Sequence, residues 1–336
     1  MTAEQPAVWY TRCPVPTASG VAIDIGQLAA AGLVAAPLHQ SGITEAHFDH
    51  RLPALFREGG NVPALWARSR GERTRLIGLT WVPEMQVVVA RADSGITGPE
   101  DLIGRRLVLP THGGDRVDFF RAMALRGFDA ALRSIGRRLD DVRLVDAPAP
   151  LPQTTDVGAE GFYGATVRAL RAGLGDAGYL KGAPGADVLA DPDLRIVVDL
   201  AALPDARLQI NNGTPRTLTV SEELLDRRPD VVARYVAALR DAAGWAARHP
   251  EQTARIVAAE TGSTLGAVRR AYGHGLAAWL EPELRPEWIE HLEEQKRFLL
   301  DHGVLPHDFS IHDWIDPGPL AASDVHRSPH RTEVSS

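Results

Sequence analysis

Short apolar runs alternate with stretches of helical periodicity in the first third of the chain. Four runs predict strands, at residues 7–11, 33–38, 75–80 and 85–90. Apolar residues at helical spacing predict helices at residues 19–31 and 44–56, the second with Thr44 as N-cap and limited by Pro53 and the pair Gly59-Gly60. Alternating strands and helices form parallel βαβ units, in which ligands gather at the carboxyl ends of the strands.

The middle of the chain continues this alternation. A strand at residues 106–109 leads through the loop Thr111-His112-Gly113-Gly114 into a helix from about residue 115. The unpaired amides and the dipole at such a helix start favour an anion, so Thr111, His112 and Gly113 are candidate binding residues, although a plain connecting turn also explains the loop. Further strands are predicted at residues 142–145, 176–180, 195–200 and 217–221, with a helix at 163–171.

Helical periodicity dominates the last third of the chain. Pro229 suits the first position of a helix whose apolar stripe runs from Val232 to Ala246, and two or three more helices follow to about residue 302. From about residue 316 the periodicity is lost, so residues 317–336 are expected to form an irregular tail. Several histidines lie in or near this tail, but their irregular spacing favours exposed side chains over a metal cluster.

Composition excludes several classes of protein. The 336 residues carry a net charge of −7, so no basic surface for nucleic acid or anionic lipid is expected. Cys13 is the single cysteine, which rules out an internal disulfide and any site with several thiolates. No run approaches 18 apolar residues, and the start of the chain lacks the pattern of a secretory signal, so we expect a cytoplasmic protein without a membrane span.

Common nucleotide-binding and hydrolase motifs are absent from the chain. It contains no GxGxxG, no GxxxxGK[ST] and no GxSxG at a strand-to-helix turn. Instead, the order of its elements, with the segments DSGITGPEDLIGRRLVLP, RIVVDL and LTVSEELLDRRPDVVARYVAALRDAAGWAARHPEQTARIVAAETG, resembles the type II periplasmic-binding-protein fold. The resemblance covers about residues 7–300 and lies in the branch that binds sulfonates and pyrimidine precursors.

That fold implies two α/β lobes joined by crossing strands, with the ligand in the cleft between them. The expected first lobe comprises residues 1–90 and 200–316, with the C-terminal helices packed on its outside, and the second comprises residues 91–199. Such folds usually occur as monomers, and a monomer is expected here. The fold alone does not distinguish a transport receptor from an enzyme.

The N-terminal region carries a more specific resemblance. Cys13-Pro14-Val15-Pro16 follows the first strand, His47-Phe48 comes ten residues before Arg57, and the pair Gly59-Gly60 follows that arginine. This pattern is similar to that of the aryl-sulfinate desulfinases, which hydrolyse 2'-hydroxybiphenyl-2-sulfinate to 2-hydroxybiphenyl and sulfite. The resemblance implies that Cys13, His47 and Arg57 are catalytic, that Gly60 offers an amide to the sulfinate beside Gly59, and that neither cofactor nor metal is needed.

The chemistry of these side chains suits a small anionic organosulfur substrate. Arg57 can give two parallel hydrogen bonds to sulfinate oxygens, and Phe48 would supply an apolar wall. As a thiolate, favoured by Arg57 and a protonated His47, Cys13 is a nucleophile toward sulfur; as a thiol, it can give its proton to the ring carbon. His47 can act as a base or as a donor to the developing sulfite.

Each of these residues alone has an ordinary explanation, and the sequence departs from the family in places. A lone cysteine is most often a small buried side chain, and Arg57 and His47 would usually be surface residues. His50 stands where the family has a tyrosine that lines the pocket, and the second lobe offers little aromatic surface for a biphenyl. A smaller or more polar sulfinate is therefore as consistent with the sequence as the biphenyl compound.

Two other functions fit the same fold. A solute-binding protein for a sulfonate or another small organic anion would be exported, and the missing signal segment disfavours it. A relative of the thiamine-pyrimidine synthases would use a histidine and metal ligands, and the single cysteine leaves no cysteine-rich motif for that role. The joint spacing of Cys13, His47 and Arg57 therefore favours the desulfinase.

Overall fold

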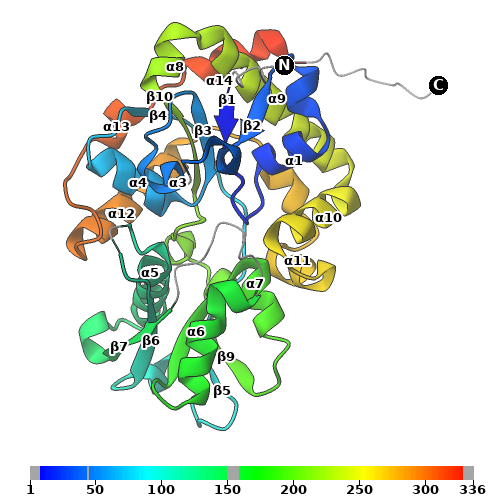
Figure 1. Ribbon diagram of the computed structural model, residues 1–336. Helices are drawn as coiled ribbons and strands as arrows, with labels where there is room; N and C mark the ends of the chain where they lie inside the picture. The colour runs from blue at the N-terminus through cyan, green and yellow to red at the C-terminus, as the bar shows by residue number, and fades with distance from the viewer. Residues whose placement is uncertain (1–7, 44, 115, 150–158, 328–336) are drawn as a thin grey trace.

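The computed structural model has two lobes, each built around one five-stranded sheet (Figure 1). It describes residues 8–43, 45–114, 116–149 and 159–327. The chain crosses from the first sheet to the second after strand β4 and returns after strand β9. The predicted α/β architecture of two lobes is confirmed.

The first sheet presents the ends of two parallel strands toward the second lobe. Strands β1 and β3 are parallel neighbours, and β10 lies antiparallel between β3 and β4. The spatial order β2-β1-β3-β10-β4 comprises β1 (Val8–Tyr10), β2 (Ala35–Pro37), β3 (Leu55–Gly59), β4 (Thr74–Thr80) and β10 (Arg216–Ser221). Because β1 and β3 run in the same direction, the residues that follow them meet at one edge of the sheet.

The predicted helix at residues 44–56 is wrong over residues 45–56, and its predicted N-cap, Thr44, lies outside the residues that the structure describes. The structure has a single helical turn, α3 (Ala46–Asp49), followed by the central strand β3. His50 ends α3 with φ of 58°, and Ala54 has φ of 55°, so the backbone turns away from the helix before the strand begins. Every residue of β3 is buried, including Arg57 and Glu58, so the strand lacks the alternation by which half-exposed strands are recognised.

The second sheet begins earlier in the chain than expected. Strand β5 pairs antiparallel with β8 and β9, although residues up to 90 were expected in the first lobe. The spatial order β7-β6-β8-β5-β9 comprises β5 (Gln86–Arg91), β6 (Arg106–Thr111), β7 (Arg143–Pro148), β8 (Ala177–Lys181) and β9 (Leu194–Asp199). The crossing therefore lies at residues 81–85, where Glu84 is the one charged residue in an otherwise apolar segment between β4 and β5.

Helices cover both faces of each sheet. The first lobe holds α1 (Ala18–Asp24), α2 (Gln27–Ala30), α3, α4 (Asn61–Ser69), α8 (Glu222–Arg227), α9 (Pro229–Arg248), α10 (Pro250–Thr261), α11 (Leu265–Tyr272), α12 (Pro286–Asp301), α13 (Ile311–Trp314) and α14 (Gly318–Ser323). The second holds α5 (Phe119–Arg133), α6 (Ala159–Arg171) and α7 (Gly182–Val188). None of the described helices has the length and apolar character needed to cross a membrane.

The expected irregular tail is helical in its first part. Helix α14 and a 3₁₀ turn at Asp324–His326 lie within residues 317–327. Arg240 of α9 donates to Ser323 at 2.9 Å and to Asp324 at 2.5 Å, which attaches this segment to the first lobe. The sequence did not predict this helix because it is short and is stabilised by an arginine of a distant helix, so its own residues show no long periodic pattern.

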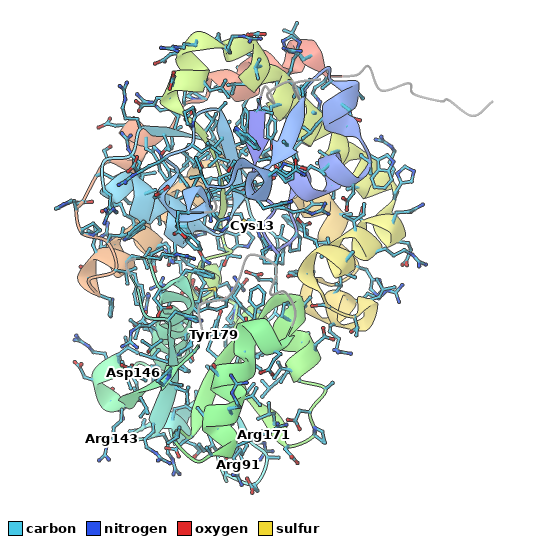
Figure 2. The ribbon with its side chains drawn as sticks, in the orientation of Figure 1. Cys13, Arg91, Arg143, Asp146, Arg171 and Tyr179 are labelled. Carbon is cyan, nitrogen blue, oxygen red and sulfur yellow. The ribbon has the colours of Figure 1, made fainter. Side chains whose placement is uncertain are left out.

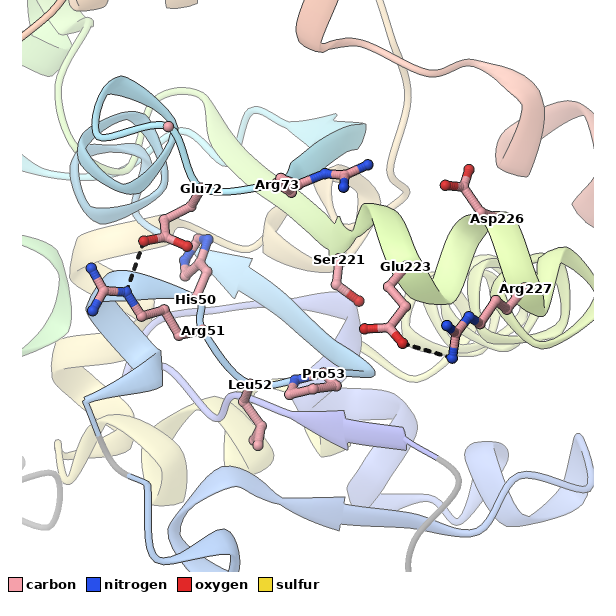
Figure 3. A pocket seen from close by; sticks show the side chains of 11 residues that line it. His50, Arg51, Leu52, Pro53, Glu72, Arg73, Ser221, Glu223, Asp226 and Arg227 are labelled. Atoms are coloured by element: carbon pink, nitrogen blue, oxygen red, sulfur yellow. Dashed lines mark hydrogen bonds and ion pairs between the residues drawn. The ribbon is translucent and has the colours of Figure 1, made fainter.

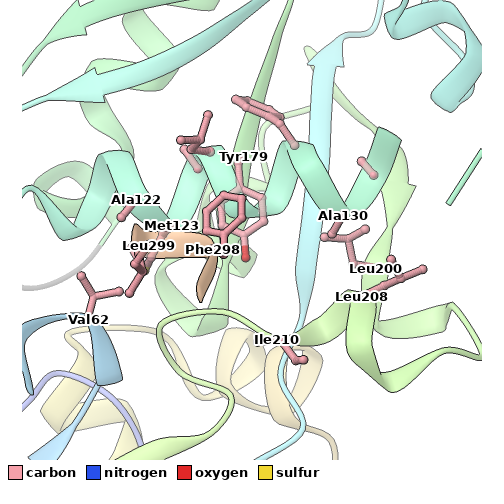
Figure 4. Close-up of a cluster of buried hydrophobic side chains, with 14 of the residues drawn as sticks. Val62, Ala122, Met123, Ala130, Tyr179, Leu200, Leu208, Ile210, Phe298 and Leu299 are labelled. Atoms are coloured by element: carbon pink, nitrogen blue, oxygen red, sulfur yellow. The ribbon is translucent and has the colours of Figure 1, made fainter. Parts of the chain in front are cut away.

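Two helical contacts join the lobes away from the crossing strands. Beside α5, the core continues into α12 through Phe298 and Leu299 (Figure 4), and Arg126 donates to Glu294 at 2.8 Å. On the opposite side, the α11 end of the first lobe meets α7, where the hydroxyl of Thr264 donates to Asp187 at 2.7 Å. The lobes are therefore tied along two borders.

Candidate active site

A cavity lies between the lobes at the edge where β1 and β3 end. Figure 2 shows Cys13 at the level where the two lobes meet. The cavity has a volume of about 80 Å³, room for several water molecules. Its walls include Cys13, Pro14, His47, Arg57 and Gly60 from the first lobe, Phe119, Met123, Phe162, Tyr163 and Lys181 from the second, and Glu84, Asn212 and Gly213 from the crossing segments. The three predicted catalytic residues thus face one space.

Cys13 is held in a tight turn just after β1. The amide of Thr11 donates to the carbonyl of Phe56 at 3.0 Å, which extends the pairing of β1 with β3, and the carbonyl of Cys13 accepts from the amide of Val15 at 2.7 Å. The side chain is 4% exposed. A Cβ on Gly59 would lie 2.4 Å from the Cys13 sulfur, so only glycine leaves room for the thiol beside β3.

Arg57 brings a buried guanidinium to the same place. It is 2% exposed, and its Nε donates to the carbonyl of His47 at 3.1 Å while Nη1 donates to the carbonyl of Gly60 at 2.8 Å. Its Nη2 lies on the Cys13 side of Gly59. Both bonds go to neutral carbonyls, so an anion in the cavity would compensate this buried charge.

The protonation states differ from those that would favour a thiolate. Enclosure, Arg57 and Arg116 together lower the pKa of His47 to about 3, so this imidazole is neutral near pH 7. Burial raises the pKa of the Cys13 thiol, and the attraction of Arg57 opposes that rise without cancelling it. The lowered pKa of His47 therefore disfavours the protonated imidazole that would favour a thiolate, and the site holds a thiol beside a neutral imidazole.

Gly60 lies beside the first turn of α4. The amide of Asn61 donates to the carbonyl of Asn212 at 2.8 Å, and the amide of Val62 donates to its Oδ1 at 2.8 Å. A Cβ on Gly60 would lie 2.6 Å from the Asn212 side chain. Glycine thus lets the return crossing pack on the start of α4, while the helix dipole favours an anion near Gly60.

The second lobe supplies an aromatic wall that sequence analysis missed. Phe119, Phe162 and Tyr163 line the cavity, although little aromatic surface was expected from this lobe. Phe48 lies one layer further out, where its ring stacks on that of Phe119 with centroids 6.2 Å apart. The pairs Phe119-Phe120 and Phe162-Tyr163 begin two helical segments, and these pairs were the available signal.

The loop before α5 does not reach this cavity. Thr111, His112 and Gly113 were candidate anion-binding residues, and the structure places them outside its lining. The amide of His112 donates to the Asp118 carboxylate at 2.7 Å, and the amide of Arg121 donates to the same carboxylate at 3.0 Å. A carboxylate of the chain itself therefore occupies the position where an anion was expected.

His50 is buried on the other side of β3. It borders a separate hollow with Arg51, Leu52 and Glu72 (Figure 3), and it is not part of the lining around Cys13. Neither ring nitrogen has a hydrogen-bond partner among the described residues. Burial, the nearby Arg57 and His47 hold the pKa of His50 well below its ordinary value, so this imidazole is neutral near pH 7.

Three charged residues near the crossing strands were also missed. Lys181 Nζ donates to Glu84 Oε1 at 2.7 Å, and Arg216 Nη2 donates to Glu84 Oε2 at 3.0 Å. Lys181 is one of two lysines in the chain and follows a predicted strand, which was the available signal. In the described part of the chain, no group of three or more His, Cys, Asp or Glu side chains is arranged to hold a metal ion.

Comparison with known proteins defines the class. The NMT1/THI5 like family matches residues 62–253. The desulfurization enzyme DszB superposes with a TM-score of 0.75 at 29% identity, covering 95% of this chain and 99% of that one. The aliphatic sulphonate binding protein SsuA from Escherichia coli, at 13% identity and a TM-score of 0.66 over 92% and 91% of the two chains, shares the fold alone. The protein therefore has the predicted two-lobed periplasmic-binding-protein fold.

Curated relatives then identify the family. The 2'-hydroxybiphenyl-2-sulfinate desulfinases of Rhodococcus erythropolis and Rhodococcus qingshengii are each 32% identical over 340 residues, which covers 92% of this chain and 91% of theirs. A cysteine-to-serine mutant of DszB in complex with biphenyl-2-sulfinic acid superposes at 29% identity with a TM-score of 0.76, over 95% of this chain and 99% of that one. The chain belongs to the 2'-hydroxybiphenyl-2-sulfinate desulfinase family, which confirms the predicted resemblance.

Proposed function

We propose that this protein hydrolyses the carbon–sulfur bond of an aromatic sulfinate. Water adds across the bond: the ring carbon gains a proton, and sulfur leaves as hydrogen sulfite. The observation that carries the proposal is a buried thiol, a buried guanidinium and a neutral imidazole facing one cavity. Family membership supports the same reaction, because curated relatives over nearly the whole chain are sulfinate desulfinases.

Arg57 is the proposed anchor for the sulfinate. Its Nε and Nη1 bonds to backbone carbonyls fix the guanidinium plane, and Nη2 is directed to the Cys13 side. A sulfinate oxygen would accept a charge-assisted hydrogen bond from this cation, which has no carboxylate in hydrogen-bond contact among the residues that the structure describes. The start of α4 at Gly60 adds a favourable dipole for the second oxygen.

Cys13 is the proposed proton donor to the ring carbon. Burial favours the thiol, which supports proton donation over attack on sulfur as the first step. When the thiol protonates the carbon, the carbon–sulfur bond breaks, sulfur dioxide forms, and Arg57 stabilises the thiolate. Water then hydrates sulfur dioxide, and its proton restores the thiol; neutral His47 can accept and return that proton.

The opposite wall is suited to hold the ring. Phe119, Phe162 and Tyr163 offer apolar faces across the cavity from the reactive groups. Aromatic side chains hold aromatic ligands in stacked or edge-to-face contacts. We therefore include aryl sulfinates with one or two rings in the proposed substrate class.

Sulfite release from a panel of aryl and alkyl sulfinates tests the proposal. The wild type is expected to release sulfite from at least one aryl sulfinate, and Cys13→Ser to lose about 10²- to 10⁴-fold in kcat, the usual range for a lost general acid. Thermal unfolding of both proteins serves as the folding control. Tight binding of sulfinates or sulfonates without sulfite release would indicate a solute-binding protein instead, and full activity of Cys13→Ser would contradict the role of the thiol.

A further inference from the structure

Two buried cations share one carboxylate where the chain crosses between the lobes. Glu84 is fully buried and binds Lys181 through Oε1 and Arg216 through Oε2. The Nε and Nη1 atoms of Arg216 have no hydrogen-bond partner among the residues that the structure describes. The cluster therefore carries one positive charge more than its carboxylate balances, and a buried charge without compensation is costly.

The two other buried acids nearby are in contact with other partners. The oxygens of Glu58 accept hydrogen bonds from the amides of Ala18 and Ser19 at 3.2 and 2.7 Å. Glu260 pairs with Arg12 at 3.4 Å. Glu84 is therefore the carboxylate in contact with both cations of the cluster.

Of the two cations in the cluster, Lys181 is the one that lines the cavity. It ends β8, it is 6% exposed, and it lines the cavity together with Glu84. Its backbone is fixed because its carbonyl accepts from the Tyr163 hydroxyl at 2.9 Å and its amide donates to that hydroxyl at 3.0 Å. An ammonium group has three N–H donors, and the contact with Glu84 uses one of them.

The backbone at Gly213 packs closely against the ammonium group of Lys181. A Cβ on Gly213 would lie 2.5 Å from Lys181 Nζ and 2.3 Å from Glu84 Oε1. The return crossing thus passes directly over the ion pair, and glycine is the residue that permits the approach. Lys181 is held from the second lobe, whereas Arg57 is held from the first, so the cavity contains two separately anchored cations.

We propose that Lys181 is a specificity-determining residue that binds a second anionic group, a carboxylate, on the aromatic sulfinate. This inference rests on the proposed function, in which Arg57 takes the sulfinate. A carboxylate balances the extra charge of the cluster and accepts a charge-assisted hydrogen bond from Nζ, whereas a neutral hydroxyl leaves that charge uncompensated. The substrate class is therefore a carboxylated aryl sulfinate.

The test compares carboxylated and unsubstituted substrates. Sulfite release is measured for benzenesulfinate and for its 2-, 3- and 4-carboxy derivatives, because the three isomers place the carboxylate at different distances from the sulfinate group that Arg57 holds. We expect kcat/KM of the wild type to be at least about tenfold higher for one carboxy isomer, the scale of one charge-assisted hydrogen bond. Lys181→Met should reduce this ratio toward one, mainly through a higher KM for the carboxy isomer.

A matched control separates the cavity cation from general charge loss. Lys181→Met leaves Glu84 paired with Arg216, so the remaining buried pair is balanced in charge. Arg171→Met removes an exposed cation on α6 of the same lobe and should retain the wild-type preference. If Lys181→Met does not fold, the wild-type panel still measures the preference for a carboxylated substrate. Lys181→Arg then tests whether this preference is retained when the charge at this position is kept.

Different results contradict the inference and the proposed function. Equal kcat/KM for all four compounds in the wild type, or an unchanged preference in Lys181→Met, would overturn the role of Lys181 while sulfite release continues. Absence of sulfite from every compound, including the wider panel of aryl sulfinates with one or two rings, would contradict the proposed function instead. In that case, calorimetric binding of the same four compounds to wild type and Lys181→Met tests the carboxylate site by itself, with equal affinities as the contradicting result.

Discussion

The two walls of the cavity are built from different kinds of residues. The first-lobe wall is formed by Cys13 from the turn after β1, His47 from α3 and Arg57 from β3, at the edge of the sheet. The second-lobe wall presents Phe119 and Phe162 from two helices. In the proposed function, the first lobe cleaves the bond and the second lobe recognises the ring, so mutations in the two walls should affect different kinetic constants.

Arg57→Ala should have the largest effect on substrate binding. Removal of a desolvated cation from a charge pair costs about 2–5 kcal/mol. This range corresponds to a loss of about 30-fold to several thousand-fold in kcat/KM for every sulfinate, aryl or alkyl. Steady-state kinetics of sulfite release provide the measurement, and an unchanged KM and kcat would remove Arg57 from the first-lobe wall.

Gly59→Ala should displace the thiol without removing it. The new Cβ would lie 2.4 Å from the Cys13 sulfur, so the sulfur must move. A shift of about 1 Å costs on the order of 10²-fold in rate, and kcat should fall while KM changes little. Gly266→Ala in helix α11, where the nearest atom would lie 3.7 Å away, is the matched control and should keep wild-type kcat. Equal kcat in Gly59→Ala and the wild type would show that the sulfur position is unimportant.

Phe162→Ala should act on aromatic substrates alone. Phe162 is half-buried in the cavity wall and contacts Phe120 edge to face at 5.3 Å between centroids. Loss of part of its apolar contact should cost about 1–2 kcal/mol, seen as a KM about 5- to 30-fold higher for aryl sulfinates. An alkyl sulfinate serves as the internal control, and an equal loss for both substrates would contradict the assignment of ring recognition to the second lobe.

The last prediction concerns unfolding stability and pH instead of a kinetic constant. The folded pKa of His47, about 3, lies below its unfolded value of about 6.5, so its stabilising contribution is present above pH 6.5 and is lost as pH falls from 6.5 toward 3. Relative to His47→Phe, the wild type should lose about 1.4 kcal/mol of unfolding free energy per pH unit in this range. Denaturant unfolding at several pH values measures this difference.

The control for this experiment is His312→Gln, which removes an exposed histidine on α13. Its unfolding free energy should stay parallel to that of the wild type between pH 7 and pH 4. If the curve for His47→Phe is also parallel to that of the wild type, then His47 is not buried in its neutral form, and the first-lobe wall is open to water.

The sequence predicted the first-lobe wall better than the second. Cys13 and its prolines form a local motif, and its position after a strand follows from one short apolar run. Arg57 was placed at a helix end, because the buried polar pair Arg57-Glu58 obscures a central strand. The cluster around Glu84 could not be predicted, since Lys181 is 97 residues away and Arg216 is 132 residues away, and only the crossing between lobes brings them together.

The ties between the lobes determine how a reactant reaches the sulfur. Contacts of α12 with α5 and of α11 with α7 hold the two lobes together along two borders. The cavity can therefore open more easily along the third border, where Arg116 pairs with Glu45 at 2.5 Å. Among the described residues, this third border holds that half-exposed ion pair, the Arg116 guanidinium over the Phe48 ring, and the ring contact of Phe48 with Phe119. Breaking these contacts costs little free energy. The sulfinate therefore enters and the sulfite leaves past the guanidinium of Arg116, which attracts both anions.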